Sequence, residues 1–251
     1  MKTENQLHVL NGDALRQQFP ESVGGKQVVC RECLVVGDLE GETLQAFYET
    51  RARYLSENYG GTRDDYFKKV VPNFETIAET PPTTEINLWF EEDLFCQVNC
   101  WFVLHLLVQN HHENIFLVRP TTLSPYGFAA YNQEELATLL LQRIRLDNLE
   151  LLAQLWPQYK ANNTKQLQEV ASLVSATYPF IANAVQAYIQ SIPTKDSLGV
   201  PSETLIAISK ALKTNHFGTI FKEFCRQLPI YGYGDLQVKQ LYDSLLQQGL
   251  L

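Results

Sequence analysis

The segment Glu85-Ile-Asn-Leu-Trp-Phe-Glu-Glu-Asp-Leu-Phe-Cys-Gln-Val-Asn99 decides the predicted fold of this chain. Apolar and polar residues alternate from Ile86 to Phe90, which predicts a strand, and from Leu94 onward apolar residues recur at helical spacing. The acidic turn Glu91-Glu92-Asp93 separates the two elements. Ligands of open α/β sheets bind where strand ends meet helix starts, so this turn is the first place to expect a functional site.

The patterns on either side of this segment extend the same architecture. Strands are predicted at 7–10, 27–36 and 114–118, and helices at 14–19, 41–59, 64–79 and 93–109. Strands alternating with helices predict a Rossmann-like, open, mainly parallel sheet over residues 1–130. After Pro120 only helical patterns follow, so residues 131–251 are predicted to be an all-helical C-terminal part, within which 200–251 is a candidate three-helix subunit. The helices of residues 131–251 are expected at 133–145, 147–156, 164–175, 179–192, 202–213, 217–227 and 234–248.

Composition and charge narrow the classes of function. The chain has 251 residues and a net charge of −8. Residues 1–130 hold 10 lysines and arginines against 18 acidic residues, which accounts for the whole excess. No basic surface for gripping nucleic acid is visible there. The sequence does not begin like a signal peptide, and no apolar run is long enough to cross a membrane. The number of cysteines is odd. These features favour a cytoplasmic protein with reduced thiols, outside the membrane.

The candidate site gathers polar residues at the ends of the predicted strands. Carboxyl ends of parallel strands share one edge of a sheet, where we expect a small polar ligand, nucleotide- or sugar-like, to bind with or without a metal ion. Asp13 and Asp93 are the first candidates for a catalytic base or for holding a divalent cation. The alternative is that both merely cap helices. The residues expected to line the site are Asn11, Gly12, Asp13, Arg31, Glu92, Asp93 and Gln97.

Arg31 and Glu32 form a charged pair inside a mostly apolar predicted strand, where burial of a charge is costly unless it is paired. One simple arrangement has Arg31 reaching the acidic turn. The motif Asn11-Gly12-Asp13 lacks the glycine spacing of a dinucleotide fingerprint, and no phosphate loop is present. No cofactor is therefore assigned.

The cysteines suggest a metal site that their spacing disfavours. Cys30, Cys33, Cys96 and Cys100 could supply four thiolates, but residues three apart in a strand face opposite sides and cannot converge on one zinc ion. Buried, inert thiols are the better interpretation, and no residue is assigned to a metal. No serine nucleophile or cysteine–histidine pair is recognisable, so covalent catalysis has no support.

The competing hypothesis is a non-enzymatic regulatory or interaction protein that uses its helical C-terminal part. The helices at 202–213, 217–227 and 235–248 could form a helix-turn-helix unit. Its few basic residues favour a protein partner over DNA. The pair Tyr231 and Tyr233 is explained by neither hypothesis.

Several ordered segments together resemble the uncharacterised bacterial family called domain of unknown function eighteen thirty-five. The resemblance implies a Rossmann-like N-terminal part, a helical C-terminal part and no particular reaction. The segments that carry it are His8–Asp13, Val29–Leu34, Leu88–Gln97, Tyr178–Ile181 and Ser197–Glu203.

Overall fold

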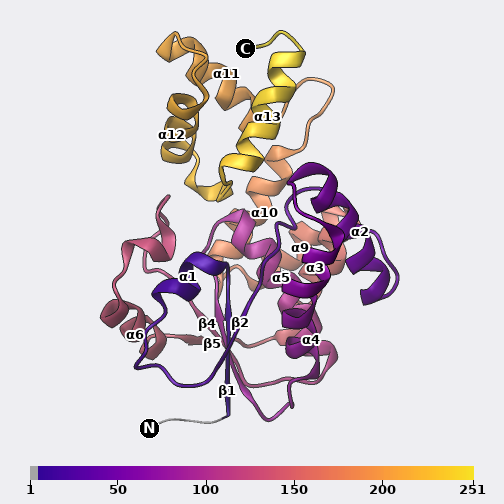
Figure 1. The fold of residues 1–251 in the computed structure, drawn as a ribbon, viewed down its shortest axis with the longest axis vertical. Coiled ribbons are helices and arrows are strands. Elements are labelled where there is room, and N and C mark those ends of the chain that lie inside the picture. Colours follow the sequence, from indigo (N-terminus) through magenta and orange to yellow (C-terminus); the bar gives the residue numbers. More distant parts are fainter. Residues whose placement is uncertain (1–4) are drawn as a thin grey trace.

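The computed structural model describes residues 5–251 and contains a five-stranded sheet with helices on both faces (Figure 1). The strand order is β2-β1-β3-β4-β5, with β1 to β4 parallel and β5 antiparallel to β4. The strands are β1 (Gln6–Leu10), β2 (Lys26–Val29), β3 (Glu85–Trp89), β4 (Ile115–Val118) and β5 (Ile144–Arg145).

The predicted alternation of strands and helices is confirmed through β4. The helices of this part are α1 (Asp13–Gln18), α2 (Leu44–Asn58), α3 (Arg63–Lys69), α4 (Val71–Glu79) and α5 (Leu94–Gln109). After β4 come the 3₁₀ helix η1 (Gly127–Ala130), α6 (Gln133–Leu141), α7 (Leu149–Leu152), α8 (Leu155–Lys160), α9 (Thr164–Val174) and α10 (Pro179–Ser191). The chain ends with α11 (Val200–Leu212), α12 (Phe217–Gln227), the 3₁₀ helix η2 (Pro229–Tyr231) and α13 (Asp235–Gln247).

Two hydrophobic clusters cover the two faces of the sheet. On one face α1, η1 and α6 pack through Leu15, Phe128 and Leu136 against Trp89 of β3. On the other face α2 to α5 and α8 to α10 form the larger core, with Trp101 at its centre. Nearly all of α5 is buried because it lies between the sheet and the later helices. The core therefore joins residues from both sides of position 130.

The structure differs from the sequence-based expectation at several points. The helices expected at 64–79 and 147–156 are each divided into two, α3 and α4 and then α7 and α8. β2 ends at Val29, so Arg31 and Glu32 follow the strand instead of lying within it. A short fifth strand, Ile144–Arg145, pairs with β4 where a helix was predicted, so the part after residue 130 is not exclusively helical. Helix α11 begins at Val200, before the expected Ser202, because Gly199 with φ 82° turns the chain and Pro201 fits the first helical turn.

The three helices α11, α12 and α13 lie beyond the carboxyl edge of the sheet, in orange and yellow in Figure 1. They enclose a small core of their own, centred on Leu205, Ile220 and Phe224. Tyr233 and Leu228 pack against both this core and the main core. No helix within residues 5–251 has the length and apolar character needed to cross a membrane.

Candidate functional site

Polar side chains after β1 and on α5 form a hydrogen-bonded network between the carboxyl ends of β1 and β3. These two strands are neighbours in the sheet, and the chain continues from β1 to β2 on one side and from β3 to β4 on the other. Asn99 is fully buried and donates from Nδ2 to Asn11 Oδ1 at 3.1 Å and to the Glu32 carbonyl at 2.7 Å. Asn11 in turn donates from Nδ2 to Cys96 Sγ at 2.8 Å. These hydrogen bonds hold the Asn11 side chain in one orientation, directed at Cys96.

Asp13 and Arg31 bind each other. Arg31 donates from Nε and Nη2 to the two carboxylate oxygens of Asp13, both at 2.7 Å, and from Nη1 to the Lys69 carbonyl at 3.0 Å. The expected reach of Arg31 to the acidic turn is therefore wrong. The interpretation of Asp13 as a helix cap is also wrong, because Gly12 holds the cap position of α1 and no side chain caps it. The positive φ of Gly12, 104°, explains its place in this turn.

Glu32 is paired instead with Arg51 of α2. Both side chains are fully buried, with Arg51 Nη2 2.8 Å from Glu32 Oε2, and the Tyr66 hydroxyl donates to Glu32 Oε1 at 2.6 Å. Arg51 also donates to the carbonyls of Val36 and Cys33. Every charged group here is paired and hydrogen-bonded, which is the arrangement that makes burial of an ion pair tolerable. This network is structural.

Of the three carboxylates in the acidic turn after β3, one forms an ion pair with another described residue, and the other two do not. Glu92 forms an ion pair with Arg119, which follows β4. Asp93 caps α5, accepting from the Cys96 backbone N–H at 2.9 Å, so the alternative interpretation of this residue as a helix cap is confirmed. Gln97 donates to the Glu91 carbonyl at 2.7 Å and so braces the turn.

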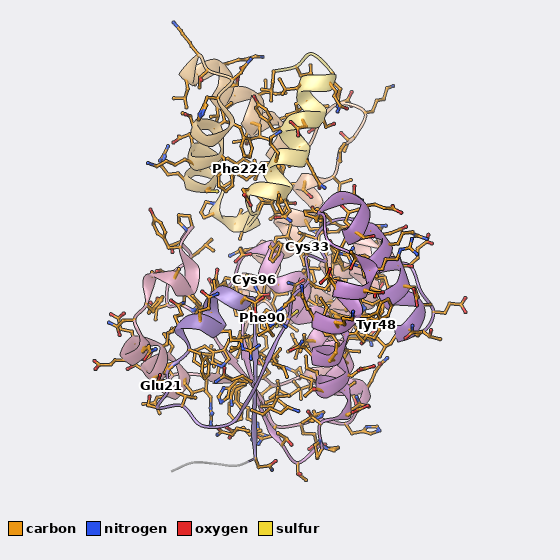
Figure 2. The ribbon with its side chains drawn as sticks, viewed as in Figure 1. Glu21, Cys33, Tyr48, Phe90, Cys96 and Phe224 are labelled. Atoms are coloured by element: carbon orange, nitrogen blue, oxygen red, sulfur yellow. The ribbon has the colours of Figure 1, made fainter. Side chains whose placement is uncertain are left out.

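Glu91, Asp93 and Cys96 come together as a cluster whose carboxylate and thiol atoms lie within 4.8 Å of one another. They line a cavity of about 110 Å³ at the boundary between the α/β part and the C-terminal helices. Ser124 and Pro125 close one side, and the segment from Phe224 to Tyr233 closes the other. In Figure 2, Cys96 lies just below these helices and Phe224 lies above it.

Two glycines allow the backbone to approach the two carboxylates closely. A Cβ at Gly127, where φ is 47°, would overlap the carboxylate of Glu91, and a Cβ at Gly232, where φ is 61°, would overlap that of Asp93. The Phe128 backbone N–H also donates to Glu91 Oε1 at 2.8 Å. The acidic pair is thus enclosed by main chain from two distant segments of the sequence.

Burial and the closeness of the groups to one another shift the pKa values of this cluster. Burial, followed by the negative charge of Asp93, raises the pKa of Glu91 to about 7, although the Phe128 N–H opposes the shift. Burial also raises the pKa of Asp93, against the opposing effect of the hydrogen bonds from Cys96. Burial and then the two carboxylates raise the pKa of the Cys96 thiol well above its ordinary value. The cluster therefore favours a proton or another positive charge.

Two basic side chains of the C-terminal helices form ion pairs. Arg226 and Lys239 are paired with Glu223 and Asp243 on their own helices.

Tyr231 is buried, and Tyr233 stacks on Phe224. The two tyrosines thus pack the boundary between the cores, which accounts for a feature that the sequence left unexplained.

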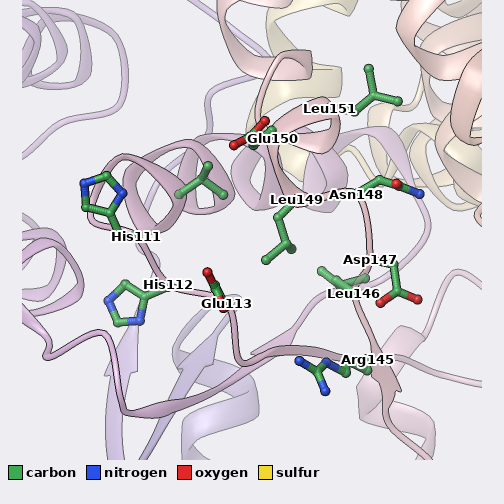
Figure 3. Close-up of a pocket in the computed structure, with 11 residues that line it drawn as sticks. His111, His112, Glu113, Arg145, Leu146, Asp147, Asn148, Leu149, Glu150 and Leu151 are labelled. Atoms are coloured by element: carbon green, nitrogen blue, oxygen red, sulfur yellow. The ribbon is translucent and has the colours of Figure 1, made fainter.

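A larger cavity of about 520 Å³ lies at the opposite, amino edge of the sheet (Figure 3). Acidic and basic side chains are mixed around it, among them Glu113, Arg145 and Asp147. His112 is buried and its Nε2 bonds to the Thr80 carbonyl, which ties this ring to the neighbouring loop. In Figure 3 its ring points away from Asp147. No set of metal-ligating or nucleophilic groups converges there among the described residues.

No protein-family model, curated protein or solved structure matches this chain. The fold and the site therefore describe its class directly: an open, mainly parallel α/β sheet with a largely buried cluster of two carboxylates and a thiol at its carboxyl edge.

The sequence predicts the correct edge of the sheet, but only one of the seven residues expected to line the site lines the cavity. Asp93 lines the cavity, whereas Asp13, Arg31 and Glu92 form ion pairs, and Asn11, Gly12 and Gln97 are supporting residues. Glu91 and Cys96 were not selected. Glu91 could have been predicted from its position in the same turn as Asp93. The contact of Gly232 with Asp93 could not, because no local pattern links two residues so far apart in the chain.

Proposed function

We propose that this protein recognises a small polar ligand at the carboxyl edge of a Rossmann-like sheet, in the cavity lined by Glu91, Asp93 and Cys96. The observation that carries the proposal is the pair of neighbouring carboxylates, the half-buried Glu91 and the buried Asp93, with no ion-pair partner among residues 5–251. A buried carboxylate needs a compensating proton, hydrogen-bond donor or cation. The ligand therefore presents a hydrogen-bond donor or a positive charge.

The size of the cavity limits what enters it. A volume of about 110 Å³ corresponds to roughly three to four water molecules. An amine, a hydroxyl group, the amino edge of a base or a metal ion fits such a space, whereas a whole nucleotide does not. A nucleotide- or sugar-like ligand would thus place only one polar end between Glu91 and Asp93.

If the protein is an enzyme, Glu91 is the better candidate for a general acid or base than Asp13. Its pKa of about 7 lies near neutral pH, where a group exchanges protons most effectively. Asp13 is held by Arg31 on the surface and does not line the cavity. The resemblance to domain of unknown function eighteen thirty-five is compatible with this arrangement and supplies no reaction.

The test is a thermal-shift panel of amines, sugars, nucleotides and divalent metals on the wild-type chain. A ligand at a hundred times its Kd adds about 2.7 kcal/mol to the free energy of unfolding, which for this size raises Tm by roughly 5–10 °C. Asp93→Asn and Glu91→Gln should abolish the response.

Asp13→Asn is the matched control, because it removes a carboxylate at the same sheet edge but outside the cavity. Its response should equal that of the wild type. A flat panel, or a response lost in Asp13→Asn and retained in Asp93→Asn, would overturn the proposal.

A further inference from the structure

We propose that Glu91, Asp93 and Cys96 bind a divalent metal ion of the zinc class, in a site completed by the C-terminal helices. This inference rests on the proposed function and names the charge that the cavity accepts. Its starting point is geometric: one ligand atom from each of the three side chains lies within 4.8 Å of the others, and all three side chains line the same cavity.

An independent observation points to a missing positive charge. Three other carboxylates at this sheet edge each have an arginine partner, in the pairs Asp13–Arg31, Glu32–Arg51 and Glu92–Arg119. Glu91 and Asp93 have none among the described residues, yet Asp93 is only 3% exposed. Each carboxylate accepts one backbone N–H but has no counter-charge, and burying a carboxylate in this state is costly, so this pair binds either a proton or a cation.

Cys96 favours the cation. A bound proton needs only the two carboxylates, whereas a thiol turned into the same cavity adds the soft donor that zinc and cobalt prefer. Asn11 donates to Cys96 Sγ at 2.8 Å, and Asn99 holds Asn11 in that orientation. Such a hydrogen bond to a ligand atom is typical of metal sites.

The donor set also indicates the kind of metal and the state of the site. Two carboxylates and one thiolate suit Zn²⁺ or Co²⁺ better than Mg²⁺ or Ca²⁺, which prefer oxygen ligands only. Three protein ligands leave the fourth tetrahedral position for water or the polar end of a ligand. Ser124 and Tyr233 also line the cavity.

Titration of the wild-type chain with Co²⁺ tests the inference directly, because thiolate ligation gives cobalt a charge-transfer absorption in the near ultraviolet. We expect this band to appear with one equivalent of Co²⁺ and to disappear when Zn²⁺ is added. Cys96→Ser should lose the band, and Asp93→Asn, which retains an oxygen for the helix cap, should weaken binding at least tenfold.

Cys225→Ser is the matched control, since Cys225 lines the same cavity but stands outside the cluster. It should retain the wild-type band. A band that persists in Cys96→Ser, or no Co²⁺ or Zn²⁺ binding by a wild-type chain that is folded by circular dichroism, would overturn the metal site.

Failure of the metal site and failure of the proposed function are distinguishable. If the chelator-treated protein still responds to an organic amine or hydroxyl compound through Glu91 and Asp93, the pair accepts a proton or donor, and only the metal inference is lost. If neither metals nor organic compounds bind, both are lost.

Discussion

Gly232, in the turn before α13, lies directly against the carboxylate of Asp93, 139 positions earlier in the chain. A side chain on Gly232 would overlap Asp93 Oδ1. This contact closes the cavity, because it joins the C-terminal helices to the turn that follows β3. The two parts of the molecule therefore meet at the proposed functional group.

Gly232→Ala should destabilise this boundary. Alanine at φ 61° is strained, and its Cβ would also force the turn away from Asp93. Gly60→Ala is the matched control, because Gly60 also has a positive φ, 75°, but nothing lies within 4 Å of its Cβ position. Urea unfolding should show a loss for Gly232→Ala that exceeds that of Gly60→Ala by about 1 kcal/mol or more. Equal losses would contradict the close contact.

Glu91 should give the protein an unusual dependence on pH. Its pKa is raised to about 7 in the folded state, so folding favours the protonated carboxyl. The free energy of unfolding is therefore highest below about pH 4.5 and falls as pH rises through 7. The difference is on the order of 3 kcal/mol. Unfolding in chelator-treated buffer should show a clearly smaller slope for Glu91→Gln than for the wild type, with the raised pKa of Asp93 accounting for what remains. Glu57→Gln, on the exposed surface of α2, should leave the slope unchanged.

His8 should act in the opposite sense. Its buried ring accepts from Trp89 Nε1 at Nδ1, 3.1 Å away, and donates from Nε2 to the Gly24 carbonyl at 2.9 Å, which fixes the neutral form. Burial lowers the pKa of His8 below 6.5. Its contribution is complete above pH 6.5 and is lost as pH falls, since the unfolded chain then binds the extra proton. His8→Gln should flatten this acid limb, whereas the same change at the exposed His111 should retain it.

Arg51 should be far more important for stability than its neighbour Arg53. Arg51→Met leaves Glu32 buried without a counter-charge, which should lower the free energy of unfolding by about 3–5 kcal/mol. Arg53 on the same helix pairs with Asp38, and both of these side chains are 47% exposed, so Arg53→Met should cost less than about 1 kcal/mol. Urea unfolding of both variants gives the comparison. Similar losses would show that the buried pair is not the stabilising feature.

The sequence by itself determined the local elements and the edge of the sheet where polar groups collect. Alternating apolar residues from Ile86 to Phe90 and helical spacing after Leu94 identify β3 and α5, and an aspartate before a helix identifies the cap at Asp93. These features depend on residues close together in the chain. Local spacing is therefore enough to predict them.

The tertiary structure alone decided which polar groups are neutralised and which are not. Arg31, Arg51 and Arg119 each reach a carboxylate on another element, and within residues 5–251 this leaves Glu91 and Asp93 without an ion-pair partner. Pairing at a distance depends on packing, because two groups can interact only after the core has placed their elements side by side. For the same reason β5, two residues long, is a strand only because β4 offers it an edge.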